Sequence, residues 1–321
     1  MRALVYERYG SPEVLRLEQV PRPEPGPGEV LVRVRAASVN SWDWDLLIGR
    51  PLARIFAPFH PAHRILGADI AGNVEAVGDG VSTLSVGDPV FGDLSEGAWG
   101  GFADYAVAKA AALAPIPDGL TFVDAAAMPQ AGALALQGLR RRVKLRQGDT
   151  VLLNGAGGGV GTIALQLAKH AGAKVTAVDR AEKREALLEL GADSFIDYRD
   201  TDYTSDADRY DLILDVVASR PLRAYAHALR DGGNLVVIGG TMGTLLQVAA
   251  LGHSTGKRRN QRLELLMYRV SVADNTELAR QCLTGLLRPV VDSVHPLEEG
   301  GKALARLGSG LAVGKVVVAM K

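Results

Sequence analysis

Hydrophobic and polar positions follow one period in the first third of the chain and another after about residue 121. Residues 29–39 (EVLVRVRAASV) alternate apolar and polar side chains with a period of two, which predicts a β-strand. Further strands, broken by glycine-containing turns, are predicted within 71–81 and 87–93. Residues 21–29 hold too many prolines and glycines for a helix or a central strand, so they are expected to form a loop. This part of the chain is expected to form a β-rich domain.

From residue 121 onward the pattern alternates between strands and helices. Residues 121–140 have a helical pattern, with Thr121 as the expected N-cap and Asp124 in the position of a capping box. Strands are predicted at 150–154, 174–178, 194–197, 211–217 and 234–240, and helices at 160–171, 182–190, 221–230 and 275–287. Apolar, β-branched strands separated by helices indicate a parallel sheet that is covered on both faces.

Composition and charge narrow the class of protein. The chain has 321 residues, which suggests about two domains, and 47% of them are hydrophobic. Lys plus Arg equals Asp plus Glu at 36 each, so there is no electrostatic case for nucleic acid or an anionic membrane as a partner. The single cysteine, Cys282, excludes an internal disulfide framework and a multi-cysteine zinc lobe. No apolar run approaches the ~18 residues of a membrane span, and we expect a cytoplasmic protein with a small-molecule substrate.

A glycine-rich loop follows the strand predicted at 150–154. Residues 155–161 read GAGGGVG, which is not the standard G-x-G-x-x-G spacing. The loop nevertheless leaves a strand and opens a helix, where glycines let the backbone approach a pyrophosphate and the helix supplies N–H donors. The alternative is a flexible turn without a ligand. We predict a dinucleotide cradle, with cofactor contacts from Gly155, Gly157, Gly158, Gly159 and Val160.

The choice between NAD and NADP is not settled by the residues that follow the second strand of this motif. Asp179 stands where an acidic residue takes the ribose hydroxyls, which favours NAD(H). Arg180, Lys183 and Arg184 follow at once, and such groups suit a 2′-phosphate, although they also fit a solvated helix start. We expect NADP(H) to be preferred and keep NAD(H) open because of Asp179.

Several motifs, in this order, are similar to one known family. The stretches RAASVNSWDW, ILGADIAGNVEAVGDGVSTLSVGDPVFGD, NGAGGGVGTIALQLAKHAGAKV, LGADSFIDY and GKVVV resemble the medium-chain dehydrogenase/reductase superfamily, in its zinc-independent quinone-oxidoreductase-like branch. The resemblance implies an α/β fold in which residues 1–121, completed by 285–321, form a GroES-like β-barrel domain. Residues 122–284 would form a Rossmann domain with a doubly wound parallel sheet. The resemblance also implies a homodimer and hydride transfer, usually from NADPH, to quinones or enones.

The zinc ligands of the zinc-using relatives have no counterparts here. Asn40 occupies the region of their thiolate, and residues 67–69 read GAD where those relatives have G-H-E. His60 and His63 lack an evident third ligand, whereas a catalytic zinc needs three, so we expect no metal. Without zinc, polarisation of the carbonyl must come from hydrogen bonds or from a preformed electrostatic site, which suits conjugate reduction better than alcohol oxidation.

The resemblance also assigns roles to single residues in the first domain. Asn40 would be the catalytic residue at the nicotinamide end, where it orients the nicotinamide or binds a substrate carbonyl; the alternative is a turn asparagine. Asp43 is expected to hold the local fold. Trp42, Trp44 and Gln130 would line the substrate pocket, although at least one tryptophan is expected to be ordinary packing.

The remaining assignments concern the cofactor and the specificity segment. Tyr198 would complete a 2′-phosphate pocket with Arg180 and Lys183, and Lys315 would contact the cofactor or lie on the surface. Gly239 and Gly240 end a strand at the carboxyl edge, where ligands sit in open α/β sheets. Residues 241–260 depart most from a regular pattern, and we expect them to hold much of the substrate specificity.

The sequence thus predicts an NADPH-preferring, zinc-independent reductase of quinones or α,β-unsaturated carbonyl compounds. Two alternatives stay open. One is an alcohol or aldehyde dehydrogenase without zinc. The other is an NADPH-binding sensor or structural protein with little turnover.

Overall fold

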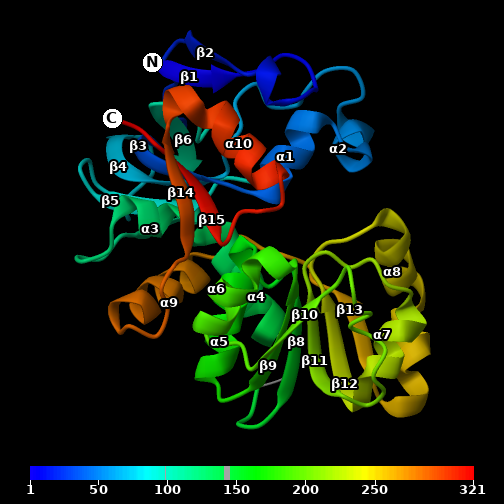
Figure 1. Cartoon of the computed structure of the whole chain (residues 1–321). Coiled ribbons are helices and arrows are strands. Elements are labelled where there is room, and N and C mark those ends of the chain that lie inside the picture. Colours follow the sequence, from blue (N-terminus) through cyan, green and yellow to red (C-terminus); the bar gives the residue numbers. More distant parts are fainter. Residues whose placement is uncertain (98, 141–144) are drawn as a thin grey trace. The chain divides into compact units, whose positions relative to one another are not determined.

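The computed structural model of the chain describes residues 1–97, 99–140 and 145–321 (Figure 1). These residues divide into two compact units. The first unit comprises Met1–Ala133, Val270–Gly285 and Pro289–Lys321, and the second comprises Leu134–Arg269 and Leu286–Arg288. Residues 122–133 and 270–284 were expected in the dinucleotide-binding domain but lie in the first unit. Their helices contact strands of the first unit.

The first unit is built on a seven-stranded sheet of order β14-β15-β3-β4-β5-β7, with β6 also paired to β3. A separate two-stranded sheet pairs β1 with β2. The strands are β1 (Arg2–Val5), β2 (Arg16–Gln19), β3 (Glu29–Val39), β4 (Asp69–Val77), β5 (Pro89–Asp93), β6 (Tyr105–Lys109), β7 (Leu113–Pro115), β14 (Val291–Pro296) and β15 (Lys315–Ala319). The strand predicted at 29–39 is confirmed as β3, although most of its side chains are buried on both faces.

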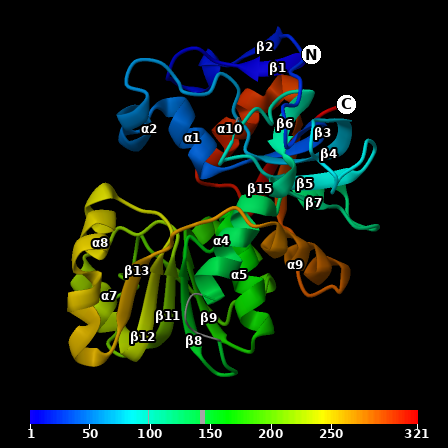
Figure 2. The ribbon, with the colours of Figure 1, turned by 180° about the vertical axis from the view of Figure 1, so that it is seen from behind.

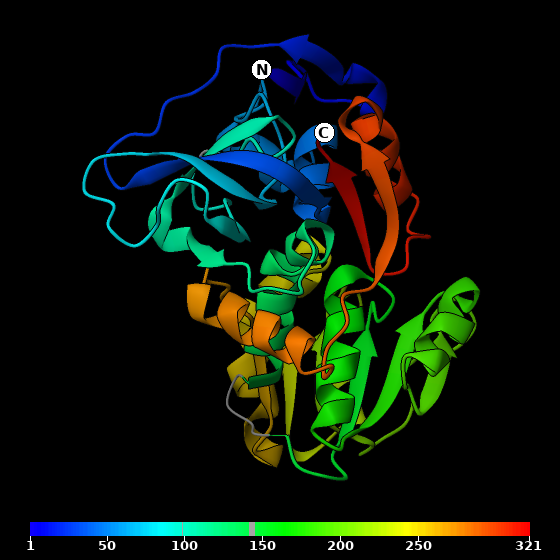
Figure 3. The same ribbon diagram turned by 90° about the vertical axis from the view of Figure 1, so that its left-hand side faces the viewer.

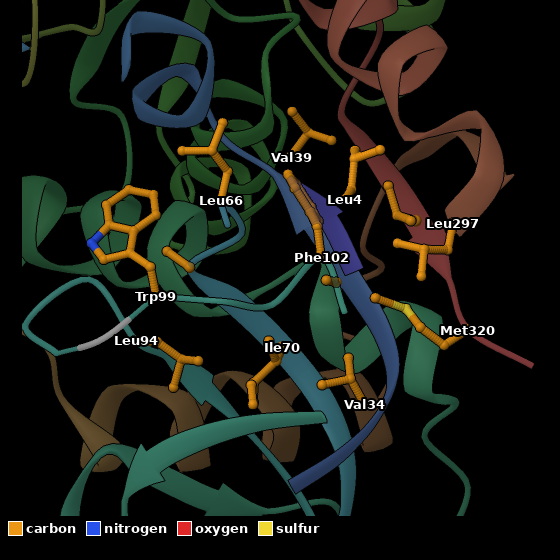
Figure 4. Packing of buried hydrophobic residues seen from close by; sticks show 14 of the residues in the cluster. Leu4, Val34, Val39, Leu66, Ile70, Leu94, Trp99, Phe102, Leu297 and Met320 are labelled. Carbon is orange, nitrogen blue, oxygen red and sulfur yellow. The ribbon is translucent and has the colours of Figure 1, made fainter. Parts of the chain in front are cut away.

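Both ends of the chain contribute to the core of the first unit. Strand β15 runs antiparallel to β3 (Figure 3). In this pairing Val316 lies opposite Val39. Figure 4 shows side chains from the N-terminal strand, the middle strands and the C-terminal segment in one buried cluster, represented by Leu4, Ile70 and Met320. Burial of the apolar side chains in this cluster is the main contribution to the stability of the first unit.

Helices cover this sheet and close its ends. They are α1 (Ser41–Ile48), α2 (Pro51–Phe56), α3 (Phe122–Ala126), α9 (Val272–Leu283) and α10 (Gly300–Gly308). Thr121 caps α3 as predicted, because its hydroxyl accepts the N–H of Asp124 at 3.1 Å. The single helix expected over 121–140 is wrong. It divides into α3 and α4 (Pro129–Arg140), since the proline cannot donate the backbone hydrogen bond that a continuous helix needs.

The second unit contains a six-stranded parallel sheet of order β10-β9-β8-β11-β12-β13. Its strands are β8 (Thr150–Asn154), β9 (Lys174–Asp179), β10 (Ser194–Asp197), β11 (Tyr210–Asp215), β12 (Leu229–Val237) and β13 (Arg262–Leu265). Its helices are α5 (Gly159–His170), α6 (Arg184–Glu189), α7 (Leu222–Ala228) and α8 (Met242–Gly256), together with most of α4 (Figure 2). The chain winds outward in both directions from β8 and β11, so the predicted doubly wound sheet is confirmed and its topological switch point lies between these strands.

Residues 241–260 are more regular than their sequence suggests. They form α8, a helix of 15 residues with Thr241 as N-cap, followed by a 3₁₀ turn. Glycines weaken the helical signal here, but Gly252 and Gly256 are needed for packing. A Cβ on Gly252 would lie 2.2 Å from the carbonyl oxygen of Leu263 in β13. Even with α8 included, no helix in the described ranges is both long and apolar enough to cross a membrane.

Candidate cofactor and active sites

The glycine loop of the second unit has the geometry of an anion cradle. Gly155 has a φ of 78°, which turns the chain away from β8, and Gly158 is the extended N-cap of α5. A Cβ on Gly161 would lie 2.3 Å from the carbonyl oxygen of Gly155, so the first turn of α5 packs directly on the loop backbone. Gly158, Gly159 and Val160 remain partly exposed. The unpaired N–H groups of the first helical turn, together with the helix dipole, fit the pyrophosphate of a dinucleotide.

Asp179 ties this loop to the end of β9. Its carboxylate accepts the N–H of Gly157 at 2.8 Å and the N–H of Arg180 at 2.9 Å. The ammonium of Lys183 lies 3.4 Å from the same carboxylate, and both side chains are buried. The carboxylate is therefore engaged within the protein, and the adjacent ammonium offsets the negative charge that would repel a 2′-phosphate.

The basic residues predicted for the 2′-phosphate occupy different environments. Arg180 donates from Nε to the hydroxyl of Tyr198 at 3.1 Å, and Tyr198 is 37% exposed just beyond β10. Lys183 is only 5% exposed and contacts Asp179 and the glycine loop. The structure thus brings Arg180 and Tyr198 together at the surface and places Lys183 beneath the loop.

A buried carboxylate that sequence reasoning missed lies at the switch point. Asp215 ends β11 and accepts from Nδ2 of Asn154 at 2.7 Å and from the hydroxyls of Tyr225 at 2.8 Å and Tyr203 at 3.1 Å. Burial raises the pKa of Asp215 to about 6, against the lowering effect of these donors. These bonds fix the carboxyl ends of β8 and β11, where the glycine loop begins. A charged residue at the end of the apolar run DLILD was the available signal.

Gly239 and Gly240 lie at the same carboxyl edge, after β12. The N–H of Ala218 donates to the carbonyl of Gly239 at 2.8 Å. A Cβ on Gly240 would lie 2.2 Å from the carbonyl oxygen of Ala218. The pair therefore lets the segment after β11 approach the end of β12, and contact with the cofactor stays a prediction.

A buried polar cluster in the first unit brings Asn40 and Lys315 together. The ammonium of Lys315 donates to Oδ1 of Asn40 and lies 3.4 Å from Oδ2 of Asp69. Asn40 is 6% exposed, Lys315 is 4% exposed and Asp69 is 0% exposed. Burial raises the pKa of Asp69 to about 6, while the charge of Lys315 lowers it. Nδ2 of Asn40 is buried and has no hydrogen-bond partner among the described residues.

Gln130 joins this cluster at the start of α4. Its backbone N–H donates to Oδ1 of Asp69 at 3.1 Å, and its side-chain Nε2 lies 3.5 Å from Oδ2 of Asp93. The structure thus gathers Asn40, Gln130 and Lys315 around Asp69, which the sequence analysis did not assign to the site. A charged residue opening the buried strand DIAGNVEAV was the signal that could have indicated it.

Asp43 holds the backbone that carries Asn40. Its buried carboxylate accepts the N–H of Asn40 and the N–H of Gly67, each at 2.8 Å. Burial raises its pKa to about 7, although both backbone donors lower it. These contacts agree with the local structural role expected for Asp43.

The two tryptophans of α1 pack against the core of the first unit. A Cβ on Gly308 of α10 would lie 2.3 Å from the ring of Trp44, so this ring fills the space between the two helices. Ordinary packing is therefore established for Trp44, as expected for at least one of the pair. A substrate contact from Trp42 stays a prediction.

The donor set around Asn40 does not fit a catalytic zinc. The side chains there are an amide, a carboxylate and an ammonium, and the ammonium would repel a divalent cation. In the part of the chain that the structure describes, no group of three or more His, Cys, Asp or Glu side chains could hold a metal ion.

Two segments match known domain families. Residues 26–118 match the alcohol dehydrogenase GroES-like domain, and residues 190–318 match the family described as zinc-binding dehydrogenase. The chain is 33% identical to the chloroplast envelope quinone oxidoreductase homolog of Arabidopsis thaliana, over 99% of this chain and 98% of that protein. It is 31% identical to the chloroplastic NADPH-dependent alkenal/one oxidoreductase of the same plant, over 99% of this chain and 79% of that protein.

Solved structures with the same fold cover the whole chain. The quinone oxidoreductase from Coxiella burnetii superposes with a TM-score of 0.90 at 27% identity, over 100% of this chain and 99% of that one. An NAD-dependent alcohol dehydrogenase superposes with a TM-score of 0.85 at 31% identity, over 100% of both chains. The matching domains and the similarity along the full length show that the chain belongs to the medium-chain dehydrogenase/reductase superfamily, in its quinone-oxidoreductase-like branch.

Proposed function

We propose that the protein is an NADPH-dependent oxidoreductase that reduces quinones or α,β-unsaturated carbonyl compounds without zinc. The observation that carries this proposal is the Asn40–Lys315–Asp69 cluster, which supplies a buried hydrogen-bond donor and a positive charge. By the sequence resemblance, Asn40 and residues 67–69 stand where zinc-using relatives have metal ligands. The names of the two plant relatives and of the Coxiella burnetii structure support the choice of acceptor.

The second unit has the residues that would hold a dinucleotide. The N–H groups of Gly159 and Val160, at the start of α5, would bind the pyrophosphate, because the N–H groups of residues 155–158 already donate within the protein. Arg180 with Tyr198 would bind the 2′-phosphate. When bound, the cofactor supplies the hydride. Asp179, paired with Lys183, keeps the loop in its binding shape.

The residues of the first unit favour conjugate reduction. As hydride adds to the β-carbon of an enone, negative charge develops on the carbonyl oxygen, and a fixed hydrogen-bond donor stabilises that charge. Asn40 would supply this donor, while a proton from water completes the saturated product. Oxidation of an unactivated alcohol would instead need a group that stabilises an alkoxide, which is the usual role of zinc.

An alcohol or aldehyde dehydrogenase is the second candidate, because one similar structure is named an NAD-dependent alcohol dehydrogenase. A panel of substrates separates the two. We expect purified protein to oxidise NADPH with a quinone or an enone and to give little turnover with saturated aldehydes or with alcohols and NADP⁺. Treatment with a strong chelator should leave the rate unchanged. Turnover restricted to aldehydes or alcohols, or loss of activity that added zinc restores, would refute the proposal.

A further inference from the structure

We propose that Lys315 is a positioning residue that acts through Asn40: its ammonium orients and polarises the amide, so that Nδ2 donates to the carbonyl oxygen of the substrate. The inference rests on the proposed reductase function and adds a residue and a mechanism to it. From its sequence position, Lys315 is expected to contact the cofactor or to lie on the surface, whereas its buried contact with Asn40 indicates a different role.

The contacts of Asn40 determine which end of its amide can reach a ligand. Oδ1 accepts from the ammonium of Lys315, and the backbone N–H of Asn40 is held by Asp43. An ammonium carries donors only, so the amide cannot turn over without placing two donors face to face. Nδ2 is therefore the other end of the amide. It is buried and makes no hydrogen bond of standard geometry among the described residues, although it lies near enough to Asp69 to lower the pKa of that carboxyl. A buried donor without a partner is destabilising, and an acceptor oxygen from a ligand would satisfy it.

The positive charge of Lys315 strengthens this donor. A hydrogen bond from an ammonium to an amide oxygen draws electron density away from the amide nitrogen, and bonds in such a chain reinforce one another at low dielectric. Oδ2 of Asp69, 3.4 Å away, holds the ammonium in place, and Asp69 is itself held by the hydroxyl of Ser38 at 3.2 Å and by the N–H of Gln130. The amide therefore transmits part of the charge toward the oxygen of the substrate.

The reaction step balances with groups already named. With NADPH bound, its hydride would form a C–H bond at the β-carbon of the enone, and the electron pair of the C=C bond would move to give an enolate. The Nδ2–H of Asn40 stabilises the enolate oxygen, and water then protonates the α-carbon. The enone is reduced by two electrons, NADPH is oxidised to NADP⁺, and one proton is consumed. Lys315 and Asn40 return unchanged.

Five variants and three readouts test this role. The variants are K315M, K315R, N40A, the double variant K315M/N40A, and the matched control K302M, which removes an exposed lysine of α10 that pairs with Glu299. The readouts are kcat with an enone, the Kd of NADPH and the melting temperature. Loss of a single oxyanion donor lowers kcat about 10²–10³-fold. We expect K315M to lower kcat about 10–100-fold and N40A at least as much, with little change in Kd. K315R should recover part of the loss, and K302M should behave as wild type.

The double variant separates a positioning role from an independent one. Because Lys315 acts through Asn40, K315M/N40A should be no slower than N40A within about twofold, whereas independent effects would multiply. Wild-type kcat in K315M, multiplied losses in the double variant, or a loss of NADPH affinity that equals the loss of kcat would each overturn the inference.

N40D provides a second test if K315M does not fold. The new carboxylate keeps an ionic partner for Lys315 and removes the amide N–H donor, so the protein should fold and lose kcat as N40A does. Wild-type kcat in N40D would overturn the inference. A wild-type protein that reduces neither quinones nor enones would instead refute the proposed function itself.

Discussion

Two glycines at the start of α5 allow the effect of a substitution on stability to be distinguished from its effect on cofactor binding. A Cβ on Gly161 would lie within 2.5 Å of backbone atoms of Ala156, and Gly161→Ala should therefore destabilise the fold by about 1–3 kcal/mol. A Cβ on Gly158 would meet only the carbonyl oxygen of Gly155 at 3.5 Å, an ordinary contact. Gly158→Ala should cost less than about 1 kcal/mol of stability.

If a pyrophosphate lies on this loop, Gly158→Ala should still raise the Kd of NADPH at least about tenfold, which corresponds to about 1.4 kcal/mol. Thermal denaturation and fluorescence titration of NADPH measure the two effects separately. Unchanged affinity in Gly158→Ala would contradict the placement of the pyrophosphate.

The preference for NADPH over NADH can be tested by substituting the basic residues after β9 one at a time. Arg180 and Tyr198, which contact each other, form the proposed 2′-phosphate site. Arg180→Ala should therefore weaken NADPH binding by about 1.5–3 kcal/mol and leave NADH binding nearly unchanged. Lys183→Ala should weaken both cofactors, because it leaves the buried carboxylate of Asp179 without its charged partner. Arg184→Ala is the control. In the wild-type protein the guanidinium of Arg184 lies over the ring of Phe195.

Titration of each variant with both cofactors gives the comparison. An equal loss of NADPH and NADH binding in Arg180→Ala would contradict the assignment of the 2′-phosphate site.

At the residue scale, the sequence indicated which residue types occupy the candidate sites better than it indicated which side chains contact each other there. The run of glycines and the position of Asp179 follow from local spacing, and both lie where they were expected. The bond between Asn40 and Lys315 joins residues 275 positions apart, and strand pairing between β3 and β15 creates it. No local pattern could reveal that contact.

At the scale of elements, periodicity predicted the central strands well because they are apolar, β-branched and separated by polar turns. The same reasoning failed for α8, in which Gly252 packs tightly on β13 and Gly256 packs on the residue that precedes β13. It also missed the break between α3 and α4, although Pro129 was visible in the sequence.

The carboxyl ends of β8 and β11 should respond to pH through Asp215. Its pKa rises from 3.8 to about 6 in the folded protein, so the folded state binds this proton more tightly than the unfolded chain does. The stability that this proton contributes is present below about pH 4 and is lost as the pH rises through about 6. Asp215→Asn removes the titration. We expect its stability relative to wild type to increase by about 2 kcal/mol between pH 4 and pH 7.

Denaturant unfolding of both proteins across that range measures the difference. The other buried carboxyls are common to both proteins and cancel in the comparison. A difference in stability that does not vary with pH would contradict the buried, ionisable environment of Asp215.

At the scale of the whole molecule, the homodimer expected from the family remains a proposal. Sedimentation equilibrium should give about twice the chain mass of 33.9 kDa if the dimer forms. A species of single-chain mass at micromolar concentration would contradict it.

The proposed function requires that the protein transfer a hydride to the β-carbon of an activated double bond. The most direct measurement uses NADPH that carries deuterium at the transferred position of nicotinamide C4, with an α,β-unsaturated ketone as acceptor. Mass spectrometry and NMR of the product locate the label. We predict a saturated ketone with one deuterium on its β-carbon. Deuterium on the carbonyl carbon of an allylic alcohol, or a reduced product without deuterium, would contradict the proposed function.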